Sequence, residues 1–456
     1  MGRSRVRLAD VRNAVEFLGY DISDEQRAPL EDVESSVVLV GGGAGGGKSF
    51  LAGSYAAPRL LLTPLLWIVG PTYEQAQAEF SEIYRNAEKM GLTDPRQAWM
   101  PKSGQWRMVT RFGQVVETKT ADDVKKLASK GPTGIIMAEA AQHPYSSFLR
   151  CQERLTRAQD PRFARWLFMS GTFEEGQPWY ADMFNALAGD NVWNGRSYSV
   201  PTWCNPYLFP LGRDDPQIIA MKRALPEDVF LERMAGQPVK PSTLIFKRFD
   251  HTVHVTDEAE LIDDWPVELW IDPGYSGSHY AIEVVQLPPD DCALGWSEKQ
   301  EVHVVDELYG HLATGPEMLE LAQEQDWWEQ VSGGVIDIAG RQHPAMPSQI
   351  EVWANAGVGL RSTFVPVLDG IQRHQTFLED PATGEPRIFV NPACTGLLDE
   401  YGKWKRKTVT KDRQVISKPE AQNCDALKAV GYGLYDRFGP IERMPPAKST
   451  RRKYPF

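Results

Sequence analysis

Short apolar runs, bounded by glycine or polar residues, recur through the first half of the chain. The first, SSVVLV, begins at Ser35. Similar runs follow at 65–71, 134–140 and 165–172. Short runs of β-branched and other apolar residues are typical of strands buried on both faces. Helix-compatible stretches lie between them, including 73–90 and 144–157. This alternation predicts an α/β domain with a mainly parallel sheet.

The second half contains another series of apolar runs, which are spaced more closely. They occupy 269–277, 279–288, 301–310 and 333–340. Close spacing is typical of hairpins, and predicted helices at about 315–328 and 420–437 follow, so a mixed sheet is expected. A proline-rich region from Val200 to about Asp264 separates the two series, and one helix is predicted inside it at 216–236.

A chain of 456 residues is too long for one ordinary core and indicates two domains. We expect a helical lead-in over 1–35 and a first domain over 36–250, whose part from about 200 is a linker region. A second domain is expected over 251–440, and the basic segment 441–456 is expected to be a flexible tail.

Composition and charge exclude several classes of protein. No run of eighteen apolar residues occurs, so no membrane span is expected, and the N-terminus lacks the apolar core of a secretory signal. The five cysteines show no CxxC pairing, which argues against a zinc site or a disulfide framework and fits a reducing cytoplasm. A net charge of −12 argues against a non-specific DNA coat but leaves DNA possible as a substrate.

The segment GGGAGGGKS at 41–49 satisfies the pattern GxxxxGK[ST] directly after an apolar strand. The backbone N–H groups of such a loop converge on phosphate oxygens, so the segment predicts an ATP site. Lys48 would reach the β- and γ-phosphates, and Ser49 would bind Mg²⁺. The alternative is a flexible glycine-rich loop. The predicted ATP-binding residues are Gly42, Gly43, Ala44, Gly45, Gly46, Gly47, Lys48 and Ser49.

A nucleotide hydrolase also needs an acidic residue at a strand end near this loop. Glu139 ends the run GIIMAEA and is predicted to orient or activate the attacking water, although it could instead be a solvated residue at a helix start. The residue before it is Ala138, where a metal-supporting aspartate is expected. At the end of another strand, Ser170, Gly171 and Thr172 could sense the γ-phosphate and couple it to movement.

Single carboxylates in the second half lie within or at the ends of apolar strands. Asp272 and Asp337 end two strands, Glu307 follows Asp306 in a third, and Asp425 lies in a helix with an apolar face. Converging carboxylates form an oxygen-only site suited to Mg²⁺ or Mn²⁺, and two such ions can cleave a phosphodiester. Each carboxylate could alternatively cap a strand or turn by itself, as Asp272 could before Pro-Gly.

A basic segment at 402–418 reads as a hairpin, in which KWKRKTVT alternates basic and other residues and Lys411-Asp412 supplies a turn. It leads directly into the helix of Asp425, so we expect it to guide DNA to the metal site through phosphate contacts. A solvated hairpin that only offsets acidic charge is the alternative. The predicted DNA-binding residues are Lys405, Arg406, Lys407, Lys411 and Arg413.

With these residues, the chain resembles the large terminase subunits of tailed bacteriophages over about 35–437. GPTYEQAQ at 70–77 resembles the second ATPase motif of that family, and KKLASKGPTGIIMAEAAQ resembles its Walker B region. SGT at 170–172 resembles its coupling motif. LPEDVFLERMAGQPV at 225–239 and FDHTVHV at 249–255 resemble its junction. DPG at 272–274 and NCDAL at 423–427 resemble its first and last nuclease motifs.

The resemblance implies an ASCE-type P-loop ATPase followed by a ribonuclease H-like nuclease. It implies a motor that pumps double-stranded DNA into a procapsid and cuts the concatemer, in a ring of typically five subunits. The portal protein and a small terminase subunit would be its partners. It would work in the cytoplasm of the infected bacterial host, docked on the procapsid and absent from the mature virion.

The family's functional residues match this chain position by position. Lys48, Ser49 and Glu139 match ATPase positions. The three nuclease carboxylates match Asp272, Asp337 and Asp425, with Glu307 as a less certain neighbour. Two departures stand out. Ala138 replaces the Walker B aspartate, and the loop lacks the arginine of many relatives. Candidates for an arginine finger, by position only, are Arg150, Arg154 and Arg157.

Two other interpretations remain open. One is a helicase-like or repair ATPase fused to a nuclease, although no helicase motif series follows SGT. The other is a portal-binding structural protein with degenerate sites, an interpretation that Ala138 supports and the intact Lys48-Ser49 pair opposes.

Overall fold

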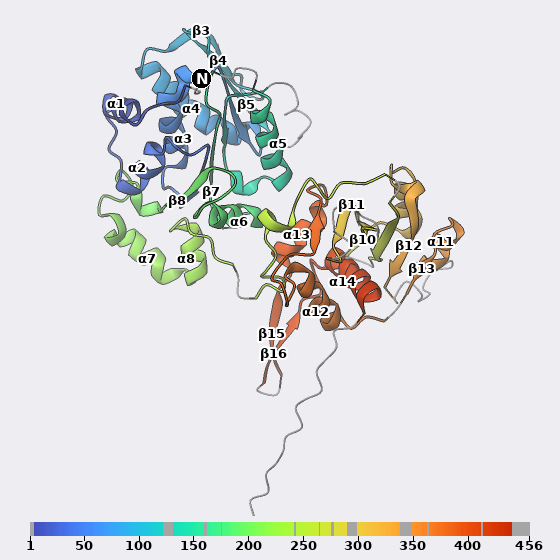
Figure 1. Ribbon diagram of the computed structural model, residues 1–456. Coiled ribbons are helices and arrows are strands. Elements are labelled where there is room, and N and C mark those ends of the chain that lie inside the picture. Colours follow the sequence, from blue (N-terminus) through green and yellow to red (C-terminus); the bar gives the residue numbers. More distant parts are fainter. Residues whose placement is uncertain are drawn as a thin grey trace, which may run out of the picture. The chain divides into compact units, whose positions relative to one another are not determined.

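The computed structural model describes residues 4–121, 131–158, 162–174, 176–240, 243–263, 265–274, 278–289, 299–337, 348–362, 364–411 and 414–439, with backbone alone at 408–411 and 414–417. The chain divides into two compact units (Figure 1). The first is Met1–Ser242 with Asp250–Thr252, and the second is Thr243–Phe249 with Val253–Phe456. Each unit is described by itself.

An eight-stranded sheet in the order β3-β4-β5-β2-β6-β7-β1-β8 forms the centre of the first unit. Its strands are β1 (Val37–Gly42), β2 (Leu65–Gly70), β3 (Thr93–Trp99), β4 (Arg107–Thr110), β5 (Val115–Thr120), β6 (Gly134–Met137), β7 (Trp166–Gly171) and β8 (Gly195–Val200). All pairings are parallel except β3 with β4 and β4 with β5. The mainly parallel sheet predicted from the sequence is therefore confirmed.

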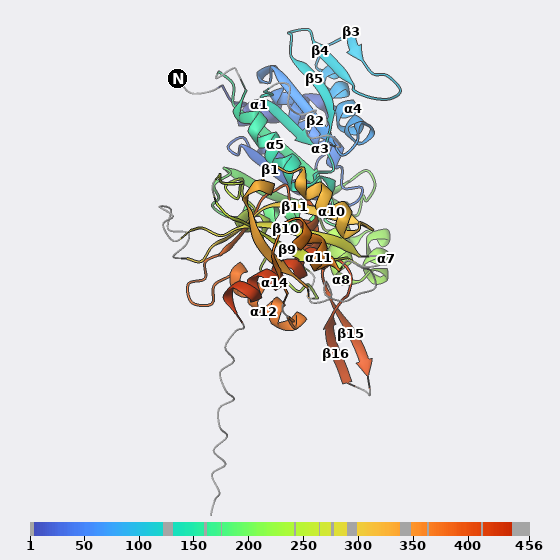
Figure 2. The ribbon, with the colours of Figure 1, turned by 90° about the vertical axis from the view of Figure 1, so that its right-hand side faces the viewer.

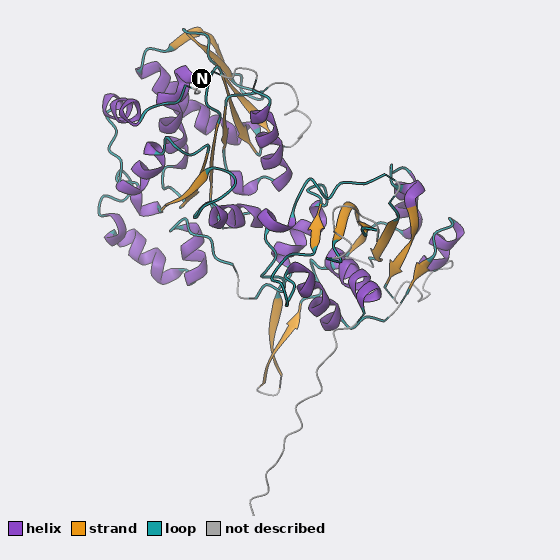
Figure 3. Ribbon diagram, viewed as in Figure 1, coloured by secondary structure: helices purple, strands orange, loops and turns teal. Residues whose placement is uncertain are grey.

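Helices flank this sheet, as the colours of Figure 3 show. They are α1 (Leu8–Leu18), α2 (Asp24–Glu31), α3 (Lys48–Ala56), α4 (Tyr73–Lys89), α5 (Tyr145–Thr156), α6 (Pro178–Ala186), α7 (Pro216–Ala224) and α8 (Glu227–Arg233). The single turn α9 (His251–His254) includes residues of both units. Within the described part of this unit, 3-10 turns occur at η1 (Ala57–Leu62), η3 (Ala140–Gln142), η4 (Thr202–Cys204) and η5 (Gly212–Asp214).

The single helix predicted over 216–236 is wrong, because this stretch forms the two helices α7 and α8. Pro226 lacks an N–H group and disfavours helical geometry in the residue before it, and Leu225 is accordingly extended, with φ −98° and ψ 145°. Elsewhere the apolar runs form strands as predicted. Every residue of β1 and of β7 is buried, as expected for central strands of a sheet covered on both faces.

The second unit contains a six-stranded sheet in the order β13-β12-β9-β10-β11-β14. Its strands are β9 (Val267–Asp272), β10 (His279–Gln286), β11 (Val302–His311), β12 (Val331–Ile336), β13 (Leu360–Arg361) and β14 (Ile388–Val390). The pairs β9–β10 and β10–β11 are antiparallel and the others are parallel, which confirms the predicted mixed sheet. A separate hairpin, β15 (Arg406–Lys411) and β16 (Gln414–Pro419), projects from the body of this unit (Figure 2).

Alternation along β9 directs side chains to two helical layers. Leu269 and Ile271 pack into a cluster with Met318 and Trp353, from helices on one face of the sheet. Trp270 points to the other face, where a Cβ on Gly433 of the opposing helix would lie 1.8 Å from its ring. The helices of this unit are α10 (Gly315–Gln323), α11 (Gln349–Asn355), α12 (Val367–Leu378), α13 (Thr395–Lys403) and α14 (Asp425–Phe438), with the 3-10 turn η6 (Trp328–Gln330).

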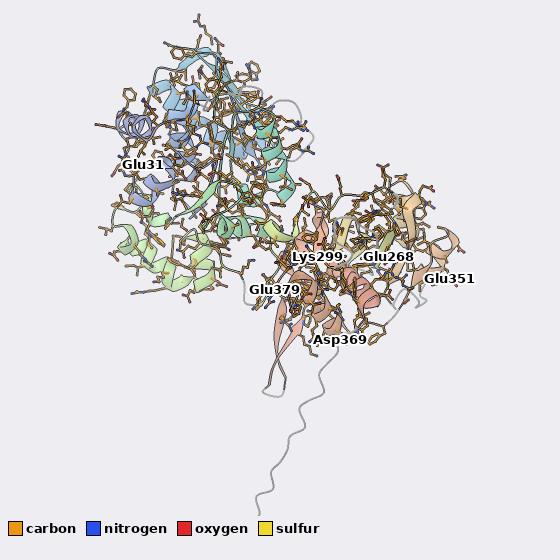
Figure 4. The ribbon with its side chains drawn as sticks, viewed as in Figure 1. Glu31, Glu268, Lys299, Glu351, Asp369 and Glu379 are labelled. Atoms are coloured by element: carbon orange, nitrogen blue, oxygen red, sulfur yellow. The ribbon has the colours of Figure 1, made fainter. Side chains whose placement is uncertain are left out.

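Ion pairs between a buried carboxylate and two partly exposed arginines fix the end of α14 to the sheet. Glu268 of β9, labelled in Figure 4, is 4% exposed and accepts hydrogen bonds from Arg437 and, at 3.2 Å, from Trp270 Nε1. Arg361 approaches the same carboxylate at 3.3 Å and also pairs with Asp436 at 2.8 Å. A buried carboxylate with this many partners is satisfied, and the network therefore holds α14 in place over β9. Among the described residues, no helix has the length and apolar character needed to cross a membrane.

Candidate functional site

The loop between β1 and α3 is built around glycines at positions that other residues could not occupy. Gly45 and Gly47 have φ values of 75° and 90°, in the left-handed region that favours glycine. A Cβ on Gly42 would lie 2.4 Å from Cγ of Lys48, so this position also excludes larger residues. The loop therefore needs its glycines both for its backbone conformation and for the path of the Lys48 side chain.

Side chains from outside the loop hold three of its carbonyl groups. Thr202 Oγ1 donates to the carbonyl of Ala44 at 2.7 Å, and Asn205 Nδ2 donates to that of Gly45 at 2.8 Å. Gln26 Nε2 donates to the carbonyl of Gly46 at 3.0 Å. These three bonds, which we call the carbonyl clamp, fix the direction of consecutive peptide groups. A hydrogen bond to a carbonyl oxygen fixes the orientation of that peptide plane, so the three bonds of the clamp together define the backbone conformation of the loop.

The first N–H groups of α3 remain for a ligand, because the start of a helix has no intrahelical acceptor for them. Lys48 and Ser49 are the first two residues of this helix. Backbone N–H groups and the helix dipole together favour a phosphate at this position. The ATP-site residues predicted from the sequence thus lie on one loop and one helix start.

Lys48 is positioned by β7, which lies beside β1 with Gly171 opposite Gly41. The Lys48 ammonium donates to Thr172 Oγ1 at 2.8 Å, and Thr172 Oγ1 donates to the carbonyl of Gly42 at 3.1 Å. The same ammonium lies 3.9 Å from Glu139 Oε1. The structure therefore brings together the loop lysine, the coupling-motif threonine and the acidic strand end. Ser170 and Gly171 are buried at the end of β7 beside them.

Glu139 has a strained backbone, with φ 45° and ψ 48° immediately after β6. This left-handed conformation is costly for a residue with a Cβ, and such strain clusters at active sites. The preceding Ala138 is fully buried, and its carbonyl bonds the ring of His143 at 2.9 Å. The strain directs the Glu139 side chain toward Lys48, whereas no carboxylate is present at position 138.

Glu79 of α4 is a site residue that no motif indicated. It is 2% exposed, and Ser49 Oγ donates to its Oε1 at 2.9 Å. Burial, with a smaller contribution from the charge of Glu139, raises the pKa of Glu79 to about 7, and the hydrogen bond from Ser49 opposes this rise. A signal was present in the sequence: Glu79 lies three residues after Ala76 and four before Ile83, on the buried face of its helix.

In the second unit, Asp272 and Asp337 lie side by side at the carboxyl ends of neighbouring parallel strands. Ile271 pairs with Ile336, and the N–H of Asp337 donates to the carbonyl of Ile271 at 3.2 Å. Asp425 is the first residue of α14, and its Oδ2 accepts the N–H of His279 at 2.8 Å. Two strands and a helix start thus supply the three carboxylates predicted for the nuclease site.

Lys428, one turn along α14, links two of these carboxylates and was missed by the sequence reasoning. Its ammonium lies 3.5 Å from Asp272 Oδ2 and 3.4 Å from Asp425 Oδ1. Burial raises the pKa of Asp272 to about 8; Lys428 opposes this rise, and Asp425 and Asp337 add to it. The position of Lys428, three residues after Asp425 on a helix, was the available signal.

The donor set suits a hard cation, since every predicted ligand is a carboxylate oxygen. As the side chains are placed, no three Asp, Glu, His or Cys residues within the described ranges stand close enough to enclose an ion. Glu307 has other partners: its oxygens accept the N–H groups of Gly396 at 2.7 Å and Leu397 at 2.6 Å, at the start of α13. Its role as a metal neighbour stays a prediction.

The hairpin β15–β16 pairs Lys407 directly with Lys418, and both side chains are exposed. Lys405 and Arg406 are half-buried at its base. Of the other predicted DNA-binding residues, Lys411 is described only by its backbone, and Arg413 lies outside the described residues. On α5 and directly after it, Arg150, Arg154 and Arg157 surround Glu153.

The carbonyl clamp generates a prediction for Thr202→Val, which keeps the shape of the side chain and removes its hydroxyl. Loss of this hydrogen bond to the exposed Ala44 costs about 0.5–1.5 kcal/mol, so we expect ADP affinity to fall by up to about tenfold. Thr376→Val is the control, because half-buried Thr376 also donates to a carbonyl, that of Arg373 at 2.7 Å. Calorimetric titration with ADP measures both variants, and equal affinities in them would refute a role of the clamp in binding.

Comparisons with known proteins give matches among solved structures. No protein-family model and no curated protein matches the chain. The large terminase of a thermophilic bacteriophage is 16% identical, with 92% of this chain and 100% of that chain covered and a TM-score of 0.40. The large terminase ATPase domain of Thermus phage P74-26 is 19% identical, over 52% and 100%, with a TM-score of 0.39.

A third match covers a smaller share of the chain. The large terminase nuclease domain of bacteriophage SPP1, solved with bound Mn, is 13% identical over 41% of this chain and 96% of that domain, with a TM-score of 0.30. The first of these terminases, from the thermophilic bacteriophage, has also been solved with ADP and with ATP-gamma-S. These three solved structures are large terminases or domains of large terminases, and the sequence motifs resemble that same family.

Proposed function

We propose that the first unit hydrolyses ATP with Mg²⁺ at the loop site. The observation that carries this proposal is the position of Lys48, whose ammonium lies at the start of α3 between Thr172 and Glu139. The N–H groups of this helix start would bind phosphate oxygens, and the ammonium would neutralise the charge that develops on the transferred phosphoryl group. Ser49 would hold Mg²⁺, which when bound shields the phosphate charge.

Glu139 is suited to handle the attacking water. Its carboxylate would accept a hydrogen bond from that water and orient it toward the γ-phosphorus, and the water proton would pass to the carboxylate as the bond to the leaving ADP oxygen breaks. Thr172 shares the ammonium of Lys48 and would sense whether a γ-phosphate competes for it. A change at this strand end offers a route from hydrolysis to movement, as proposed for the coupling motif.

The second unit is proposed to cleave DNA. Asp272, Asp337 and Asp425 would hold Mg²⁺, for which Mn²⁺ can substitute, and two such ions would supply an activated water and stabilise the leaving oxygen. Glu307 stays the less certain neighbour. The strand order supports a ribonuclease H-like fold: β9 to β11 run antiparallel, and β12 and β13 are added in parallel on the free side of β9.

Together, the proposed ATPase site and the proposed nuclease site support a DNA-packaging role, that of a large terminase subunit. In this proposal the chain pumps double-stranded DNA into a procapsid as part of a ring of about five subunits, and it cuts the concatemer. The portal protein and a small terminase subunit are the proposed partners. The proposed place of action is the cytoplasm of the infected bacterium, on the procapsid.

The division into two sites predicts a double dissociation. Lys48→Ala should abolish ATP hydrolysis, because the phosphate charge loses its ammonium, and leave Mn²⁺-dependent plasmid cleavage intact. Asp272→Asn should abolish cleavage and leave ATP turnover unchanged. Both activities are measured on the same folded preparations, with and without DNA. Loss of both activities in either folded variant would refute the division, and a wild-type chain without turnover would favour the structural-protein alternative that Ala138 raises.

The hairpin is proposed to bind the DNA backbone. Lys407 and Lys418 lie directly opposite each other, a like-charge pair that destabilises an isolated hairpin. A row of phosphates would remove this repulsion and release condensed counterions. Lys405 and Arg406 would extend the basic surface at its base, and Lys411 and Arg413 are assigned to the same surface from the sequence.

Replacing Lys407 and Lys418 by glutamine should reduce the salt dependence of DNA binding. Each lost phosphate contact lowers the slope of log affinity against log salt by about 0.9, so the double variant should lose up to about 2. Plasmid cleavage should slow at moderate salt, and DNA-independent ATP turnover should stay unchanged. The control is Lys222→Gln with Arg223→Gln on α7, which removes equal charge from exposed positions. An identical slope in both double variants would remove the hairpin from the DNA-binding surface.

A further inference from the structure

We propose that Glu79 replaces the metal-supporting carboxylate that is absent at position 138. It accepts a hydrogen bond from the Ser49 hydroxyl and adds a negative charge beside the Mg²⁺ of the bound nucleotide. This inference rests on the proposed ATPase function and assigns a metal-supporting residue to that same site. Glu79 lies on α4, not on a strand of the sheet, so the chain would supply this carboxylate from a different element.

The hydrogen bond from Ser49 determines what its hydroxyl can offer a cation. A hydroxyl has one proton and two lone pairs, and a cation needs a lone pair. Ser49 Oγ donates a hydrogen bond to Glu79 Oε1 at 2.9 Å. The proton of the hydroxyl is thereby engaged, and the lone pairs of Oγ can face the phosphate site at the start of α3. Glu79 is therefore a positioning residue for Ser49.

The second oxygen of Glu79 gives an independent indication of a ligand. Glu79 is 2% exposed, and its Oε2 is buried with no hydrogen-bond partner in the part of the chain that the structure describes. An unsatisfied carboxylate oxygen is costly to bury. A cation, or a water molecule bound to it, beside Ser49 would satisfy this oxygen.

The packing of α3 against α4 explains how Glu79 reaches the site. A Cβ on Gly53 of α3 would lie 2.5 Å from Cβ of Glu82 on α4, so this glycine lets the two helices approach closely. Gly53 lies one turn after Ser49, and Glu82 lies one turn after Glu79, so the close approach brings Ser49 and Glu79 together. A larger residue at Gly53 would separate the pair.

The two carboxylates of this site have separate partners. Glu139 lies 3.9 Å from the ammonium of Lys48, whereas Glu79 bonds Ser49. In this proposal Glu139 orients the attacking water, and Glu79 supports the bound cation through Ser49. Ala138 is fully buried, so an aspartate at that position would need a partner of its own.

The test measures how strongly Mg²⁺ increases ADP affinity, by calorimetric titration with and without the metal. Glu79→Gln keeps the size and the acceptor atom but removes the charge. Loss of a residue that supports a metal ligand typically costs about 10- to 100-fold in metal affinity, so we expect the Mg²⁺ enhancement to fall by that factor while metal-free ADP affinity is unchanged. Glu74→Gln, an exposed glutamate on the same helix, is the control and should match wild type.

A double-mutant cycle with Ser49→Ala separates positioning from a general effect. If Glu79 acts through Ser49, Glu79→Gln should cost much less in the Ser49→Ala background than in wild type. Glu79→Asp, which keeps the charge but withdraws it from Ser49, should give an intermediate loss and replaces Glu79→Gln if that variant does not fold. Wild-type Mg²⁺ enhancement in the folded Glu79 variant would overturn the inference alone. If the ADP affinity of the wild-type chain were the same with and without Mg²⁺, both the inference and the proposed function would be overturned.

Discussion

The carbonyl clamp on the loop between β1 and α3 is the constraint on which the first unit depends. A glycine-rich loop has many conformations, so ordering it costs conformational entropy. Contacts within the loop itself do not offset this cost. Thr202, Asn205 and Gln26 supply the missing bonds from segments far apart in the chain. The buried strand β7 and the edge strand β8 lie on either side of β1 and hold the base of the loop. The proposed phosphate site thus depends on tertiary structure, although the loop motif alone predicts it.

The second unit is organised around carboxylates that are buried at a cost. Lys428 lies 3.5 Å from Asp272 and 3.4 Å from Asp425, and its ammonium offsets part of the repulsion that Asp425 and Asp337 exert on Asp272. Beside them, Glu307 and Glu400 accept backbone N–H groups at the starts of α13 and α14. Helix starts favour negative charge, so acidic residues here both fix the helices and shape the field of the site.

Much of this organisation could be predicted from the sequence, because strands buried on both faces leave a strong apolar signal. The motif at 41–49 and the carboxylates at strand ends were predictable for the same reason: each follows directly from a strand. Glu79 and Lys428 were not predicted, since their roles depend on how one helix packs against another element. The prediction of one helix over 216–236 was wrong because Pro226 interrupts an otherwise favourable helical pattern and divides the stretch into two helices.

The central claim is that each unit has its own cation site, one dependent on nucleotide and one independent of it. Titration of the full chain with Mn²⁺, following the free ion by electron paramagnetic resonance, tests this claim most directly. With ADP present, two classes of bound Mn²⁺ are expected: Lys48→Ala should remove only the class that needs ADP, and Asp272→Asn only the class that does not. Loss of both classes in one folded variant, or an ADP-independent class that survives Asp272→Asn, would contradict the account.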